Sequence, residues 1–242
     1  MVTSKFTGYL SKLIYVRRRM MVQPLDTRFP KPIQKLWTEL HSDVVWLHGR
    51  WIIYRQLFGT SKERVDLLNE SAGTVTWILQ QLLLHDVQLA LSKIGDPAGT
   101  GAKKNLTLRR LQADLSSAGE AVLTSKLEPL LEQFENSCVS LRDRRNKWIA
   151  HSDLATKLAA RATPLSGPSR TEIEVALAAL RGVMNCVELH YTDSQTAYEQ
   201  FIMDEDGEHL LMTLARAKRY RDLVAEKKVP KDDLRRHYPR GV

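Results

Sequence analysis

The arrangement of apolar residues along the chain predicts a series of long amphipathic helices. Over residues 33–58, large apolar side chains recur at steps of three and four, which places them on one face of a helix. Gly59 ends this pattern, and Thr60 with Glu63 has the form of a capping box for a second helix. That helix extends up to the stretch GDPAGTGAKKN (95–105), whose Gly and Pro residues predict a loop.

The second half of the chain repeats this alternation of apolar stripes and breaks. Residues 105–116 predict a short helix, and a long helix from about Glu120 carries its apolar stripe up to residue 151. The stretch ATPLSGPS (162–169) is a linker, after which a helix is expected up to about Met203. A last helix follows residues 206–207.

Alternating strand patterns are nearly absent, so we expect an all-α fold. The helices predict an antiparallel helical bundle of four to five main helices with an additional C-terminal helix. Residues 1–23 are expected to be an N-terminal extension, either a basic interfacial helix or an unstructured segment. Residues 24–205 are expected to form the bundle, and residues 206–242 a basic C-terminal helix and tail.

Composition and charge limit the kinds of partner and the cellular location that we expect for this chain. Hydrophobic residues make up 43% and charged residues 26%, as in soluble globular proteins. The net charge of +8 suits a polyanionic partner such as nucleic acid, although many basic proteins bind none. No apolar run is long enough for a bilayer, so no membrane partner is expected. Cys138 and Cys186 form neither a disulfide framework nor a zinc signature, which predicts a reducing, cytoplasmic location.

The stretch RRNKWIAHSD (144–153) places charged groups on an otherwise apolar helix. At 100° per residue, Arg145 lies about 20° from Phe134, within the apolar stripe. A guanidinium there is costly unless it is paired or faces a cleft. His151 lies at the end of the helix, where the helix dipole favours the imidazolium and raises the pKa. A plainer interpretation makes this a solvated helix face, in which Asp143 pairs with a neighbouring cation.

The order of these residues resembles the signature of the HEPN superfamily, an Arg-Asn pair followed by a histidine after a short spacer. Arg145 and Asn146 match the pair, residues 147–150 the spacer, and His151 the histidine. The segments IQKLWTELHSDVVWLHGRWIIYRQLFG, ERVDLLNESAG, DVQLALSKIGDPAGTGAKKNLTLRRL and RNKWIAHSD follow in an order that looks like the AbiU-type branch, which is named after phage abortive-infection proteins. The resemblance covers roughly residues 30 to 200.

The resemblance implies a homodimer that forms through the helices carrying the motif, with one composite cleft between the copies. Catalytic members cleave RNA there without a metal or other cofactor, by attack of the ribose 2′-hydroxyl on the adjacent phosphate. His151 would then act as acid and base, Arg145 would stabilise the phosphate, and Asn146 would position the cleft. Three neighbouring cations are expected to contact RNA: Arg142, Arg144 and Lys147. An antitoxin or other neutralising partner is also implied.

Two other classes of function stay open. One is a non-catalytic HEPN module that binds RNA or nucleotide, or scaffolds a defence complex. The other is a basic helical DNA-binding regulator, which lacks a compact helix-turn-helix signal here. The intact Arg-Asn pair and histidine favour the endoribonuclease. His41 and His48 lie seven residues apart on the first helix without a third ligand in register, so no metal site is expected.

Overall fold

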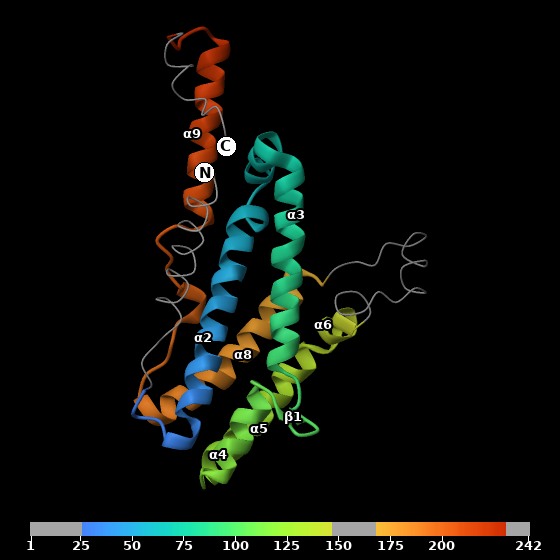
Figure 1. Cartoon of the computed structure of the whole chain (residues 1–242), viewed down its shortest axis with the longest axis vertical. Helices are drawn as coiled ribbons and strands as arrows, with labels where there is room; N and C mark the ends of the chain where they lie inside the picture. Colours follow the sequence, from blue (N-terminus) through green and yellow to red (C-terminus); the bar gives the residue numbers. More distant parts are fainter. Residues whose placement is uncertain (1–25, 147–167, 231–242) are drawn as a thin grey trace, which may run out of the picture. The chain divides into compact units, whose positions relative to one another are not determined.

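The structure, a computed structural model, describes residues 26–146 and 168–230, and the described chain is helical almost throughout (Figure 1). Its helices are α2 (Lys31–Tyr54), α3 (Lys62–Ile94), α4 (Leu108–Ser117), α5 (Ala121–Ser137), α6 (Val139–Arg144), α8 (Arg170–Thr192) and α9 (Gly207–Ala225). A π-helical turn, Arg55–Gly59, follows α2, and a 3-10 turn, Tyr198–Gln200, precedes α9. The prediction of an all-α fold is confirmed.

Helix starts lie close to the polar residues that the sequence marks, with one exception. Thr107, Ser169 and Asp206 cap α4, α8 and α9 through their side chains, as expected of short polar residues at this position. The cap of α3 differs from the expectation, because the Ser61 hydroxyl, and not that of Thr60, accepts the backbone N–H of Arg64 at 3.4 Å. The Thr60 hydroxyl donates instead to the preceding π-helical turn.

The loop at 95–105 and the end of α8 differ from the sequence-based expectation. Residues 99–104 form a short antiparallel pair of strands, β1 (Gly99–Thr100) and β2 (Lys103–Lys104). The expected helix up to Met203 is wrong beyond Thr192, because Asp193 adopts a left-handed conformation with φ of 52°. There, the Glu188 carboxylate accepts the backbone N–H of Thr196 at 2.9 Å, so local side-chain bonds replace helical ones.

The chain divides into two compact units, the first formed by residues up to 48 and by 86–201. Within it, α5 packs along α8, and α4 packs on α5. Phe29 extends this core, since its ring stacks on Trp37 and contacts Tyr191 of α8. Large side chains that are completely buried fill the core: Ile33, Leu40, Leu91, Leu111, Leu115, Leu123, Phe134, Leu177 and Leu180.

Among the described residues, the second unit comprises 49–85 and 202–230 and has a small core. Leu57, Leu68 and Leu211 are buried together there, and partly buried apolar side chains surround them. The amide of Gln56 fixes the start of α9, because it accepts the backbone N–H of Gly207 at 2.9 Å and donates to the Asp206 carboxylate at 2.6 Å. The predicted boundaries at residues 24 and 206 stay a prediction.

Replacing Phe134 by Ala should strongly destabilise the first unit. The ring is completely buried in α5, so its removal leaves a cavity and should lower the free energy of unfolding by about 3–5 kcal/mol. Urea denaturation monitored by circular dichroism measures the change. Val122→Ala is the matched control on the same helix, because Val122 is 70% exposed and its truncation should change stability by less than about 0.5 kcal/mol. Equal stability of the two variants would contradict this account of the core.

Candidate functional site

The helix that leads into the motif is broken at Cys138, where a continuous helix was expected. The backbone N–H of Cys138 donates hydrogen bonds to the carbonyls of both Phe134 and Glu135. The backbone angles of Cys138, φ of −96° and ψ of 0°, lie outside the α-helical range. The Ser137 hydroxyl donates to the Phe134 carbonyl at 2.7 Å and supports this tighter turn. A new helix, α6, starts directly after it, and Leu141 still reaches the core.

Arg145 follows α6 and forms an ion pair with Asp96, a residue just beyond the end of α3. Its Nη1 donates to both carboxylate oxygens of Asp96, at 2.9 and 3.0 Å. The two side chains are only 17% and 32% exposed, so they lie largely out of water. A guanidinium in this position needs a counter-charge, and Asp96 supplies it.

One further contact reaches the same end of α3, and another lies within the motif. Arg142 donates from Nη2 to the Gly95 carbonyl at 2.9 Å, and the Nε of Arg145 donates to Asn146 at 3.1 Å. A methyl group in place of the Gly95 hydrogen would lie 2.5 Å from Arg142 Nη2, so a larger residue at this position would require the guanidinium to move. The carbonyl end of α3, the negative end of its dipole, therefore faces two guanidinium groups.

The structure thus brings together three of the predicted site residues, namely Arg142, Arg145 and Asn146. Arg144 is half-buried, and burial lowers the pKa of its guanidinium. Lys147 and His151 lie outside the described residues, so their predicted roles stay predictions.

Sequence reasoning missed Asp96 and Gly95, which it assigned to a plain loop. A hollow of about 480 Å³ opens beside them, and its walls include Arg142 and Arg109. Arg109 is held by Glu135 at 2.6 and 2.8 Å, and this carboxylate raises the pKa of Arg109 most strongly. The cations and carboxylates around the hollow are therefore already matched in charge.

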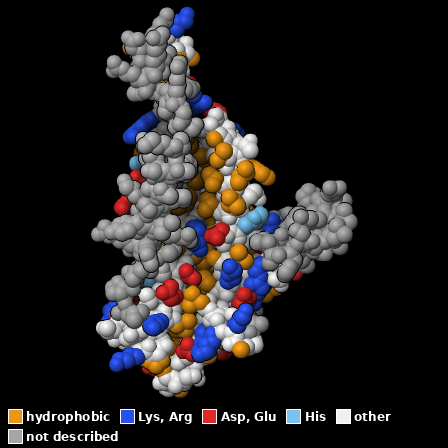
Figure 2. Space-filling model, in the orientation of Figure 1, with side chains coloured by type: hydrophobic (Ala, Val, Ile, Leu, Met, Phe, Trp, Pro, Cys, Tyr) orange, Lys and Arg blue, Asp and Glu red, His pale blue; other side chains and the backbone are white. Residues whose placement is uncertain are grey.

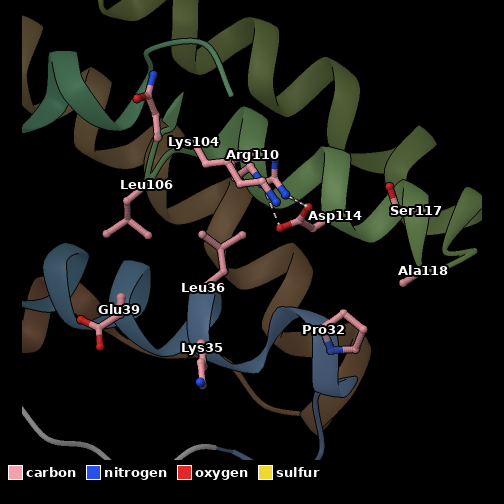
Figure 3. A pocket seen from close by; sticks show the side chains of 11 residues that line it. Pro32, Lys35, Leu36, Glu39, Lys104, Leu106, Arg110, Asp114, Ser117 and Ala118 are labelled. Atoms are coloured by element: carbon pink, nitrogen blue, oxygen red, sulfur yellow. Dashed lines mark hydrogen bonds and ion pairs between the residues drawn. The ribbon is translucent and has the colours of Figure 1, made fainter. Parts of the chain in front are cut away.

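A larger hollow of about 750 Å³ lies between the start of α2 and α4 (Figure 3). Leu36 and Leu106 point into it from opposite sides, and Arg110 on its wall is paired with Asp114 at 2.6 Å. None of the motif residues lines it, so it is separate from the candidate site.

His48 is a buried structural residue. Its Nδ1 donates to the Val44 carbonyl at 2.9 Å, so Nε2 of the neutral ring is left to accept the contact from Arg181 at 3.4 Å. Burial lowers the pKa of His48 to about 4, and the nearby Arg181 charge acts in the same direction. Over residues 26–146 and 168–230, no three His, Cys, Asp or Glu side chains gather as metal ligands would.

The all-α fold and the Arg-Asn pair directly after α6 are consistent with a helical domain of the HEPN class. The family model HEPN_AbiU2, described as AbiU2, matches residues 31–210. The chain therefore belongs to the AbiU2 family, and the resemblance stated from the sequence is confirmed. None of the curated proteins or solved structures compared with the chain matches it. In the described part of the chain, no helix has both the length and the apolar character needed to cross a membrane.

His48 should make folding sensitive to mild acid. Its pKa is about 4 in the folded chain and 6.5 for an unperturbed histidine, so between these values only the unfolded chain binds the proton. This contribution to stability is complete above pH 6.5 and is lost as the pH falls to about 4, in total about 3 kcal/mol. His48→Gln should remove it, so the difference in unfolding free energy between the variant and the natural chain should change by this amount between pH 7 and 4. A constant difference in urea titrations at both pH values would contradict the assignment.

Arg145 and Asp96 should be energetically coupled. We expect Asp96→Ala and Arg145→Ala each to destabilise the chain, since each leaves an unpaired, partly buried charge. The double variant should be more stable than the sum of the two losses predicts, by roughly 0.5–3 kcal/mol. Urea denaturation of the natural chain, the two single variants and the double variant gives the four unfolding free energies of this double-mutant cycle. The same cycle with Arg28 and Asp26, a pair in which the arginine is 57% exposed, should give a coupling below about 1 kcal/mol.

Proposed function

We propose that this chain is a metal-independent endoribonuclease of the HEPN type that acts as a toxin or phage-defence effector. Membership of the AbiU2 family supports a ribonuclease or defence role. The observation that carries the proposal is the fixed position of Arg145, which Asp96 and Asn146 hold at the end of the helix that leads into the motif. A cation stabilises the charge that develops on a phosphate most effectively when its position is fixed before the reaction.

In the proposed reaction, His151 removes the proton from a ribose 2′-hydroxyl, whose oxygen then attacks the adjacent phosphorus. The bond from phosphorus to the 5′-oxygen breaks, and that oxygen takes up a proton from a histidinium. The products are a 2′,3′-cyclic phosphate and a 5′-hydroxyl end. Arg145 balances the charge that builds up on the non-bridging phosphate oxygens.

The geometry of Arg145 suggests which atoms would do this. A guanidinium has five N–H donors, and the contacts with Asp96 and Asn146 use Nη1 and Nε. We therefore assign the phosphate contact to Nη2. We expect Arg142, Arg144 and Lys147 to add contacts with the RNA backbone.

The proposal includes a homodimer through the motif helices. On a helix, His151 and Arg145 do not share a face, and two-fold symmetry would bring the histidine of one copy to the arginine of the other. A neutralising antitoxin and a cytoplasmic location belong to the same proposal.

A non-catalytic module that binds RNA or nucleotide is the second candidate. The Arg145–Asp96 pair favours it to some degree, because a carboxylate competes with phosphate for the guanidinium and repels it. The two candidates differ in whether bound RNA is cut.

His151→Ala and Arg145→Ala should each abolish RNA cleavage, since one removes the acid and base and the other the phosphate contact. We expect the natural chain to cut mixed RNA in the presence of EDTA and to leave 2′,3′-cyclic phosphate ends, detected by mass spectrometry of the fragments. His209→Ala and Arg28→Ala, which replace exposed residues outside the motif sequence, are the matched controls and should cut at the rate of the natural chain.

Retained cleavage in a folded His151→Ala or Arg145→Ala chain would overturn the assignment of these residues. RNA binding without cleavage by the natural chain would establish the non-catalytic module instead.

A further inference from the structure

The middle of α3 carries an exposed stripe of large apolar side chains. Val75, Ile78, Leu79 and Leu82 recur at steps of three, one and three, so they lie on one face of the helix. They are 40–58% exposed, and Trp77 beside them is 61% exposed. Figure 2 shows apolar side chains gathered in the region where Figure 1 draws α3. We call Val75, Ile78, Leu79 and Leu82 the α3 stripe.

The core of the second unit does not account for this stripe. That core is built from Leu57, Leu68 and Leu211, none of which belongs to the stripe. Thr76, directly next to Val75, is buried while its apolar neighbours are exposed, so α3 turns a polar side chain inwards and apolar ones outwards. This inversion of the usual pattern is typical of a surface that another molecule covers.

The charge around the stripe indicates which molecule that is. Residues 71–85 contain no Asp, Glu, Lys or Arg, although charged residues form 26% of the chain. Two copies of a chain with a net charge of +8 repel each other, and they approach at least cost where both surfaces are uncharged. A nucleic acid or an anionic membrane would need basic residues at this face, and the segment has none.

The order of the side chains also suits a second copy. When two identical helices cross in antiparallel directions on a two-fold axis, residue i of one copy meets residue j of the other, and the reverse. With the axis between Ile78 and Leu79, Ile78 of one copy meets Leu79 of the other. Val75 of one copy meets Leu82 of the other in the same way.

We propose that two copies of this chain pair in antiparallel fashion through the α3 stripe. This contact is distinct from the one expected through the motif helices, and it does not rest on RNA cleavage.

Ile78→Arg/Leu82→Arg should separate the copies, since it places four buried cations in the contact of two chains. Light scattering after size-exclusion chromatography should give the double variant half of the particle mass that the natural protein has in solution. Val122→Arg, a matched change at an exposed apolar residue of α5, should leave the mass unchanged. A natural chain that is monomeric, or a folded double variant with the full mass, would overturn the proposal.

A second measurement keeps the test valid if the double variant fails to fold. In the proposed pairing, Leu79 of each copy lies near the axis, so a short bismaleimide should link Leu79→Cys chains into covalent dimers. Val122→Cys and the natural chain, whose own cysteines are Cys138 and Cys186, are the controls and should stay unlinked. Equal linking in all three proteins, or none in Leu79→Cys, would refute the pairing.

The same measurement separates this proposal from the proposed function. His151→Ala should have the mass of the natural chain, because the α3 stripe is unchanged in it. An inactive natural chain with intact pairing would therefore contradict only the ribonuclease, and an active natural chain without this pairing would contradict only the contact.

Discussion

The ion pair between Arg145 and Asp96 is the constraint on which the candidate site depends. A guanidinium that is 17% exposed carries a large cost of desolvation, and the chain recovers it only if a carboxylate lies in the right place. Asp96 lies there because α3 ends two residues earlier and because Gly95 lets Arg142 approach the last carbonyls. The motif and the end of α3 therefore stabilise each other.

This arrangement has a chemical consequence. The carboxylate fixes the direction of the Arg145 guanidinium before any substrate binds, so little side-chain entropy is lost later. It also cancels part of the positive charge, and a phosphate at this place gains less from Arg145 alone. Arg144, next in the chain and half-buried, is the neighbour best placed in sequence to restore a positive potential. The two adjacent arginines thus serve the proposed reaction in different ways.

Helix periodicity was sufficient for the all-α fold and for a short helix within residues 105–116, and residues 206–207 located the start of α9, because these features depend on residues close in sequence. The position of Arg145 on the apolar stripe predicted either a paired guanidinium or one that faces a cleft, and the structure shows a pair. Its identity as Asp96 could not be predicted, since 49 residues separate the two in the chain. The break at Cys138 is accompanied by a hydrogen bond from the Ser137 hydroxyl to the Phe134 carbonyl. The periodicity of apolar residues does not show where such a side chain will bond to the backbone.

The chain departs from the usual binary pattern in two opposite ways. Arg145 brings a charge to a face where apolar residues belong, and the chain itself supplies the partner. The α3 stripe brings apolar residues to a face where charges belong, and the described residues leave it uncovered. Departures from local rules persist when another requirement compensates for them, and such departures concentrate at functional surfaces. The first is compensated within the chain, and the compensation fixes the direction of Arg145. The second has no compensation among the described residues, and the proposed contact between copies would supply it.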